Sequence, residues 1–260
     1  MGARGGKIIH QPCIFRAVPL ATAERIEKYN PATLELIGEL DATAPEDIPA
    51  IISKARAAQA EWASMPLEER RSALKRLQTH VASHLDDIAR VVSEETGKPR
   101  VEAINADLMC ALSATMYSIE TMPSLFRPRG VGFGNLSVAM RYLGRRSYIQ
   151  PRPLGVVAII APWNYPLGIP FSEAVMAVAA GNAVILKPSC ETPFTGLEVR
   201  KAFIAAGVPE DLVQVVIGNG GRVGNALASS NVDRVIFTGS TEVGRNIMAA
   251  AAQRLTPVTM

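Results

Sequence analysis

Two short segments in the second half of the chain contain residue types suited to chemistry. Residues 162–166 (PWNYP) follow an apolar run and place one side-chain amide, Asn164, where a strand is expected to end. A side-chain amide there offers both a hydrogen-bond donor and an acceptor. Residues 237–244 (FTGSTEVG) place Gly239 and Ser240 after a second apolar run and before a helical segment. The free N–H groups and the dipole of a helix N-terminus favour an anion such as a phosphate.

Each segment also has a plain structural interpretation. Asn164 could be a turn residue, because asparagine is common in turns. Ser240 or Thr241 could simply cap the helix that follows. We favour a functional Asn164, since a polar amide beside an otherwise apolar run needs a reason. For residues 239–241 taken alone, the two interpretations stay open.

Two glycine motifs do not complete a known nucleotide fingerprint. Residues 218–223 (GNGGRV) have Val223 where the third glycine of the usual dinucleotide motif belongs. Residues 239–244 have the glycine spacing of a P-loop, but Arg245 and Asn246 replace the lysine and hydroxyl residue that serve phosphate and Mg²⁺. We therefore exclude a P-loop NTPase.

From residue 155 onward, apolar runs alternate with helical segments. Residues 155–161 (GVVAIIA) form a continuous apolar run, as expected for a strand that is buried on both faces. The strands are expected at 155–161, 183–186, 212–217, 234–237 and 257–260, and the helices at 171–181, 193–206, 222–229 and 241–253. This alternation predicts an α/β fold with a doubly wound parallel sheet (Rossmann-like), whose ligand lies at the carboxyl ends of the strands.

The first half of the chain has a different pattern. Apolar residues recur at helical spacing over residues 45–122, a loop rich in proline and glycine follows at 123–135, and residues 138–150 are expected to form a strand pair. The predicted division is a poorly ordered N-terminal arm (1–28), a helical part of the cofactor domain (29–137), a β-ribbon (138–152) and a Rossmann-like core (153–260).

Composition excludes several classes of protein. The chain has 260 residues, 48% of them hydrophobic and 20% charged, which suits a globular protein with a real core. A net charge of +3, evenly scattered, argues against a nucleic-acid partner. No apolar run reaches the length of a membrane span, and the N-terminus has no signal-peptide core. The three cysteines (Cys13, Cys110, Cys190) have no spacing for a metal or a disulfide framework, which favours a reduced cytoplasmic protein.

Taken together, the segments resemble the aldehyde dehydrogenase superfamily. The matching segments, in chain order, are 29–33 (YNPAT), 94–99 (EETGKP), 153–157 (PLGVV), 162–166 (PWNYP), 181–184 (GNAV), 186–189 (LKPS) and 237–244 (FTGSTEVG). The resemblance implies an enzyme that oxidises a small-molecule aldehyde to a carboxylic acid with NAD or NADP. In that family a cysteine thiolate attacks the aldehyde, hydride passes to the nicotinamide, and a glutamate activates water.

The resemblance also assigns roles to individual residues. Asn164 becomes the side-chain donor of the oxyanion hole, and Lys187 the lysine that reaches the adenosine ribose. Trp163 borders the cofactor, with core packing as an equal alternative. The full cofactor set that the resemblance implies lies at strand ends and in the turns after them: Trp163, Lys187, Ser189, Cys190, Gly220, Gly224, Phe237, Gly239, Ser240 and Val243.

One departure from the family concerns the choice of cofactor. Many NAD-preferring members have a glutamate three residues after the lysine, where it holds both ribose hydroxyls. This chain has Cys190 in that place, and its nearest carboxylate, Glu191, is displaced by one residue. A small neutral residue leaves room for a 2′-phosphate beside the cation of Lys187. The resemblance therefore implies NADP, or use of both cofactors.

A second departure concerns the catalytic groups. By resemblance, the general-base glutamate would directly follow Met260, and the nucleophilic cysteine would lie further on. Cys190 lies at the adenosine end and does not replace it. We expect residues 1–260 to be the cofactor-binding half, inactive alone, of an enzyme whose β-ribbon packs against a partner subunit in a homo-oligomer. The alternatives are a non-catalytic dinucleotide-binding or interaction module and a dehydrogenase that passes the acyl group to coenzyme A.

Overall fold

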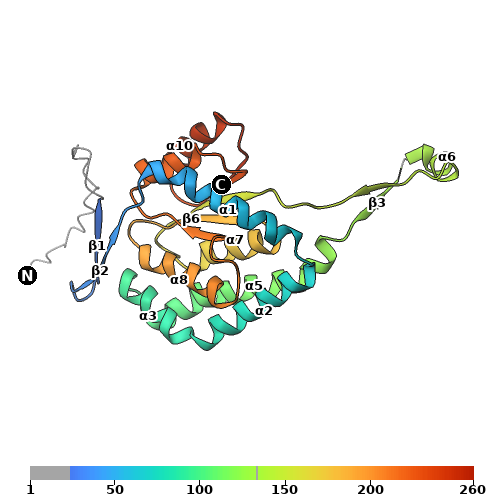
Figure 1. Cartoon of the computed structure of the whole chain (residues 1–260). Helices are drawn as coiled ribbons and strands as arrows, with labels where there is room; N and C mark the ends of the chain where they lie inside the picture. Colours follow the sequence, from blue (N-terminus) through green and yellow to red (C-terminus); the bar gives the residue numbers. More distant parts are fainter. Residues whose placement is uncertain (1–23, 133) are drawn as a thin grey trace, which may run out of the picture.

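A computed structural model describes residues 24–132 and 134–260 of the chain (Figure 1). Its centre is a parallel five-stranded sheet in the order β7-β6-β5-β8-β9. The strands are β5 (Val156–Ile160), β6 (Ala183–Lys187), β7 (Val213–Val215), β8 (Arg234–Phe237) and β9 (Val258–Thr259). Numbered along the chain, this order is 3-2-1-4-5, the arrangement of a doubly wound nucleotide-binding sheet. The predicted α/β fold class and its five strands are confirmed.

Helices cover both faces of the sheet. Helices α7 (Gly168–Ala179) and α8 (Pro193–Ala205) connect successive strands on one side of β5. Helix α10 (Thr241–Ala252) connects β8 to β9 in the opposite direction, so right-handed crossovers place it on the other face. Helix α1 (Ile48–Ser64) also packs against β5, β6 and β7. Every residue of β5 and β6 is buried, which explains why both strands are uninterrupted apolar runs until the lysine that ends β6.

A further helical layer packs outside α7. It contains α2 (Leu67–Ser83), α3 (Leu85–Thr96) and α5 (Met109–Leu125), with α5 against α7 and α2 against α5. The remaining helices are η1 (Pro45–Asp47), α1 (Ile48–Ser64), α4 (Arg100–Glu102), a π-helical turn (Ala103–Leu108), η3 (Gly134–Leu136), α6 (Ser137–Tyr142), a second π-helical turn (Gly220–Gly224) and α9 (Asn225–Ala228). The helices predicted across residues 45–122 and in the second half are confirmed.

The N-terminal part differs from the prediction. Residues 1–23, and with them Cys13, lie outside the described residues. Strand β1 (Arg25–Tyr29) pairs antiparallel with β2 (Leu36–Asp41). The expectations of a poorly ordered arm up to residue 28 and of a helical part from residue 29 were therefore wrong for this hairpin. In β1, exposed and half-buried residues alternate with the two-residue period of a strand.

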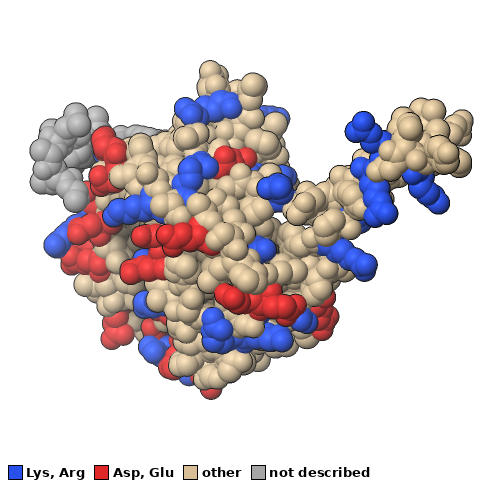
Figure 2. Space-filling model, turned by 45° about the vertical axis from the view of Figure 1, so that its right-hand side comes forward, with Lys and Arg blue, Asp and Glu red and all other residues tan. Residues whose placement is uncertain are grey.

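The ribbon also differs from the prediction. Residues 138–142 belong to helix α6, and the strand pair is β3 (Arg129–Val131) with β4 (Ser147–Ile149). The expected strand pair within 138–150 was wrong because the partner of β4 precedes the helix, in a segment whose prolines and glycines favoured a loop. The ribbon and α6 form an arm that projects from the body (Figure 1). Figure 2 shows basic but no acidic residues along this arm, and by the sequence these basic residues are all arginines.

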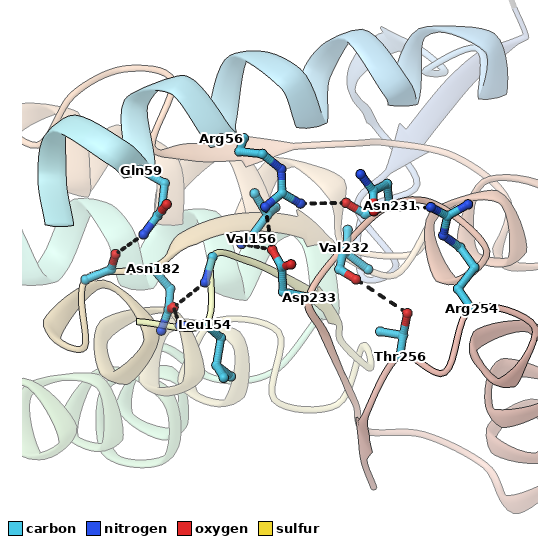
Figure 3. Close-up of polar contacts among 12 residues, drawn as sticks. Arg56, Gln59, Leu154, Val156, Asn182, Asn231, Val232, Asp233, Arg254 and Thr256 are labelled. Atoms are coloured by element: carbon cyan, nitrogen blue, oxygen red, sulfur yellow. Dashed lines mark hydrogen bonds and ion pairs between the residues drawn. The ribbon is translucent and has the colours of Figure 1, made fainter. Parts of the chain in front are cut away.

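A polar cluster joins α1 to the amino ends of the central strands (Figure 3). One oxygen of Asp233 accepts hydrogen bonds from Arg56 Nη1 at 2.8 Å and from the Val156 amide at 2.7 Å. The side-chain oxygen of Asn182 accepts from the Gly155 amide at 3.0 Å. Gly155 has a φ of 131°, and a Cβ on it would clash with the Asp233 carboxylate. The close approach of this turn to Asp233 therefore requires glycine.

Gly155→Ala should destabilise the fold by about 2 kcal/mol or more, because it adds both backbone strain and a clash with the half-buried Asp233 carboxylate. Urea denaturation should show a lower midpoint with an unchanged slope. Gly130→Ala is the matched control, since its Cβ would meet nothing within 4 Å. Equal midpoints for the two variants would contradict the importance of this cluster.

Candidate functional site

The carboxyl ends of β5 and β8 lie side by side at the point where the strand order reverses. Ile160 pairs with Phe237 at the last position of both strands, and the Thr238 amide donates to the Ile160 carbonyl at 3.1 Å. The loop with Asn164 leaves β5 here, and the turn with Gly239 leaves β8. Ligands of doubly wound sheets bind at such a switch point. The fold therefore brings the two segments with chemical potential to one edge.

The Asn164 loop presents its side chains to solvent. Trp163 is 55% exposed, which excludes the alternative that it is a core residue. Asn164 is also exposed. Directly after this loop the chain is buried again from Pro166 to Gly168, at the start of α7. The amide is therefore carried on a short loop between two buried elements.

Lys187 ends β6 and is buried, with only 3% of its surface exposed, which excludes a simple solvated lysine. Its Nζ donates to the Pro188 carbonyl at 2.9 Å. Burial lowers the pKa of Lys187, and the neighbouring Cys190 opposes that shift. A Cβ on Gly224 would lie 3.6 Å from the lysine Cδ, so the structure brings Lys187 and Gly224 into contact.

The turn after β7 starts with Asn219, whose side-chain oxygen accepts from the Gly221 amide at 2.8 Å. The π-helical turn Gly220–Gly224 follows directly, and π-helical turns are frequent at functional sites. A Cβ on Gly220 would meet nothing within 4 Å, so the space in front of that backbone is open. Gly220 and Gly224 thus lie on the open and the packed side of one turn.

Ser240 caps helix α10, because its Oγ accepts from the Val243 amide at 3.4 Å. The capping interpretation is therefore confirmed, and it leaves the dipole of the twelve-residue helix aimed at the switch point. Phe237 is 6% exposed, and a Cβ on Gly239 would clash with its ring. Phe237 therefore forms the floor of the turn, and the exposed backbone above it belongs to Gly239 and Ser240.

The loop after Lys187 contacts the N-terminal hairpin. Ser189 Oγ accepts from the Glu191 amide at 3.2 Å, and the Cys190 thiol faces Glu191 Oε1 at 3.9 Å. The other carboxylate oxygen of Glu191 pairs with Lys28 Nζ of β1 at 2.9 Å. Sequence reasoning missed Lys28, and no local signal marks it, because its partner lies 163 residues further along the chain.

Glu173 of α7 is a second residue that sequence reasoning missed. Thr238 Oγ1 donates to Glu173 Oε1 at 3.4 Å, while Glu173 Oε2 is buried without a hydrogen-bond partner among the described residues. Burial raises the pKa of Glu173 to about 7, against a smaller lowering by Thr238. A single carboxylate within the apolar run of residues 168–179 was the signal that could have found it.

A sequence model of the aldehyde dehydrogenase family matches residues 18–260. The chain belongs to the aldehyde dehydrogenase family. It is 36% identical over 232 residues to the 3,6-anhydro-alpha-L-galactose dehydrogenase of Streptomyces coelicolor, which covers 89% of this chain and 45% of that protein. It is 32% identical over 238 residues to a succinate-semialdehyde dehydrogenase [NADP(+)] of Escherichia coli, covering 91% of this chain and 48% of the relative.

Solved aldehyde dehydrogenases share the fold. The NAD+ complex of an aldehyde dehydrogenase from Bacillus cereus superposes with a TM-score of 0.83 at 30% identity, over 91% of this chain and 47% of that one. The chain thus spans about half the length of the relatives it matches. Within residues 24–132 and 134–260, no helix is both long and apolar enough to cross a membrane. The same residues contain no group of three His, Cys, Asp or Glu side chains that could hold a metal ion.

The raised pKa of Glu173 predicts a pH-dependent stability for this aldehyde dehydrogenase chain. The folded state holds the proton more tightly than the unfolded chain, so this stabilisation is complete below about pH 4.5 and is lost as pH rises through about 7. Glu173→Gln should therefore raise the free energy of unfolding at about pH 8 by on the order of 1–2 kcal/mol and change it little at about pH 4.

The measurement is urea denaturation at several pH values, with Glu120→Gln as a control on an exposed carboxylate. A Glu173→Gln curve parallel to that of the wild type across the whole range would show that Glu173 does not titrate as burial requires.

Proposed function

We propose that this chain supplies the cofactor-binding half of an NAD(P)-dependent aldehyde dehydrogenase that oxidises an aldehyde to a carboxylic acid. The observation that carries the proposal is the meeting of the Asn164 loop and the Gly239–Ser240 turn at the switch point of the sheet. Family membership supports the reaction class. In this proposal residues 153–260 form the Rossmann-like core, and residues 29–137 support it.

The residues at the carboxyl edge fit a dinucleotide. The capped N-terminus of α10 suits a pyrophosphate, because its dipole and free amides favour an anion. The open backbone at Gly220 allows close approach, and the side chain of Lys187 lies beside the same turn. When bound there, NAD(P) supplies a hydride acceptor. Ser189, Cys190, Trp163 and Val243 border this surface, and Phe237 supports it from below.

The polar residues near Lys187 favour NADP, or use of both cofactors. Cys190 carries no carboxylate to repel a 2′-phosphate, and Glu191, which does, is paired with Lys28 at 2.9 Å. The relatives use either cofactor by name, NADP in the Escherichia coli protein and NAD in the Bacillus cereus complex. A carboxylate at residue 190 would change this balance.

Asn164 is the group that acts on the substrate in this proposal. Its amide N–H donates to the aldehyde oxygen and stabilises the negative charge that develops there. The proposal assigns neither the thiolate that attacks the carbonyl nor the base that activates water to the described residues named above. In this proposal turnover depends on groups outside that set, and residues 1–260 alone are expected to be inactive.

The projecting arm supports a homo-oligomer. Val138, Tyr142 and Leu143 at its tip are 81%, 92% and 67% exposed. Six arginines and no acidic residue lie between residues 121 and 172. We propose that a second copy covers this arm, because exposed apolar clusters of this kind mark protein interfaces. A cytoplasmic location is part of the proposal and rests on cysteines that lack disulfide spacing.

Cys190→Glu should move cofactor preference toward NAD. The new carboxylate would repel a 2′-phosphate and accept the ribose hydroxyls, so the ratio of NADP to NAD dissociation constants should rise by roughly tenfold, about 1.4 kcal/mol. Titration of both cofactors measures the ratio. Cys110→Glu is the control, because Cys110 is exposed and lies on α5, not on the loop after β6. An unchanged ratio in Cys190→Glu would contradict the assignment.

Asn164→Ala tests the function itself. The variant is made in the longest protein that the gene encodes. Its kcat should fall by a factor of about 10²–10³, as expected for removal of one oxyanion donor, while its Kd for NADP stays unchanged. The assay follows absorbance of the reduced cofactor over a panel of aldehydes. Residues 1–260 alone should give no signal above the blank. Sustained turnover by this stretch, or full activity in Asn164→Ala, would overturn the proposal.

A further inference from the structure

We propose that Lys98 and Asp107 are positioning residues, which hold the loop that carries Asn164 in place by contacts to its backbone. The inference rests on the proposed role of Asn164. It concerns a motif whose function the cofactor site leaves unexplained, residues 94–99 (EETGKP). Both side chains are largely or fully buried, and both act through the backbone of the loop.

Three contacts converge on the ammonium of Lys98. Its Nζ donates to the backbone carbonyl of Asn164 at 2.9 Å and to Asp107 Oδ2 at 2.9 Å. It also lies 5.1 Å from the centre of the Tyr165 ring, which is a cation–π distance. The lysine side chain is only 10% exposed, so little solvent screens these contacts. Lys98 therefore holds the loop at the very residue whose side chain is to act.

Asp107 holds the other end of the same loop. Its side chain is fully buried, and Oδ1 accepts from the amides of Leu167 at 3.2 Å and Gly168 at 2.9 Å. These amides open α7, whose dipole favours a carboxylate there. A Cβ on Gly168 would lie 3.1 Å from the Asp107 Cα, so glycine permits this close approach. One ion pair thus fixes residues 164–168 at both ends.

Local structure delivers both side chains. Helix α3 ends at Gly97, which has a φ of 75° and turns the chain sharply toward the loop. Ser93 Oγ then donates to the Lys98 carbonyl at 2.6 Å, which fixes the backbone of the lysine. Asp107 lies in the π-helical turn Ala103–Leu108, whose wider winding moves it out of the register of an ordinary helix. The motif at 94–99 is thereby explained as the support for Lys98.

The expected consequence is a loss of alignment when the pair is broken. Lys98→Met keeps the length of the side chain and removes its charge. Amide hydrogen exchange at residues 164–168 should speed up by about tenfold or more, as expected when a buried hydrogen-bonded network loses a partner. Exchange in β5 should stay unchanged. Acrylamide should quench Trp163 more strongly, a signal that is separable because the other tryptophan, Trp62, is only 1% exposed.

Activity gives a second readout in the longest product of the gene. In Lys98→Met, kcat should fall by about tenfold or more while the Kd for NADP is unchanged, because misplacing a catalytic group by even a small distance is costly. Lys98→Arg should restore part of the loss. Lys201→Met, which removes an exposed ion pair with Glu198, is the matched control and should change neither readout.

The outcomes separate this inference from the proposed function. The inference would be overturned if Lys98→Met matched the wild type in hydrogen exchange of the loop and in Trp163 quenching. It would also be overturned if hydrogen exchange of the loop became faster while kcat stayed unchanged. If Asn164→Ala itself retains activity, the proposed function fails, while loop exchange still decides whether Lys98 holds the loop. Should Lys98→Met not fold, Asp107→Asn replaces it. That variant keeps an acceptor for the amides of Leu167 and Gly168, so only the part of the loop at Asn164 should become looser. Unchanged hydrogen exchange at that part of the loop would overturn the inference.

Discussion

The complete burial of β5 and β6 is the constraint on which the other parts of this structure depend. Strands that are apolar on both faces need helices on both sides, which gives the crossovers α7, α8 and α10 their places. Because every strand of the central sheet is parallel, the loops that follow these strands all lie at one edge of the sheet. The order 3-2-1-4-5 then makes the loops of β5 and β8 diverge and leaves a place for a ligand between them.

Buried carboxylates support the loops at this edge. Asp107 accepts from the first amides of α7, and Glu95 accepts from the amides of Phe194 and Thr195 at the start of α8, each at 2.7 Å. Burial raises the pKa of Glu95, while the bonds from Thr195 and Phe194 oppose it. A carboxylate at a helix N-terminus interacts favourably with the helix dipole, which offsets part of the cost of its burial. The outer helical layer therefore does more than cover α7.

Much of the sheet could be predicted from the sequence, since a continuous run of apolar residues is a local signal for a buried strand. The strands at 155–161 and 183–186 were visible as apolar runs. The ribbon could not be predicted in the same way. Its strands β3 and β4 are three residues each, separated by a helix, and pairing between distant short strands leaves no local pattern. The β1–β2 hairpin was missed for a similar reason.

The sequence by itself determined the fold class, the family, and the candidate site residues Asn164, Lys187 and Gly239. Strand ends and glycine turns can be recognised from short stretches of consecutive residues. Only the tertiary structure decided that Trp163 is exposed, that Lys187 is buried against Gly224, and that Glu191 is engaged by Lys28. It alone revealed Lys98 and Asp107 beneath the Asn164 loop. These facts depend on contacts between residues 37 to 163 positions apart, which chain folding creates and local spacing does not encode.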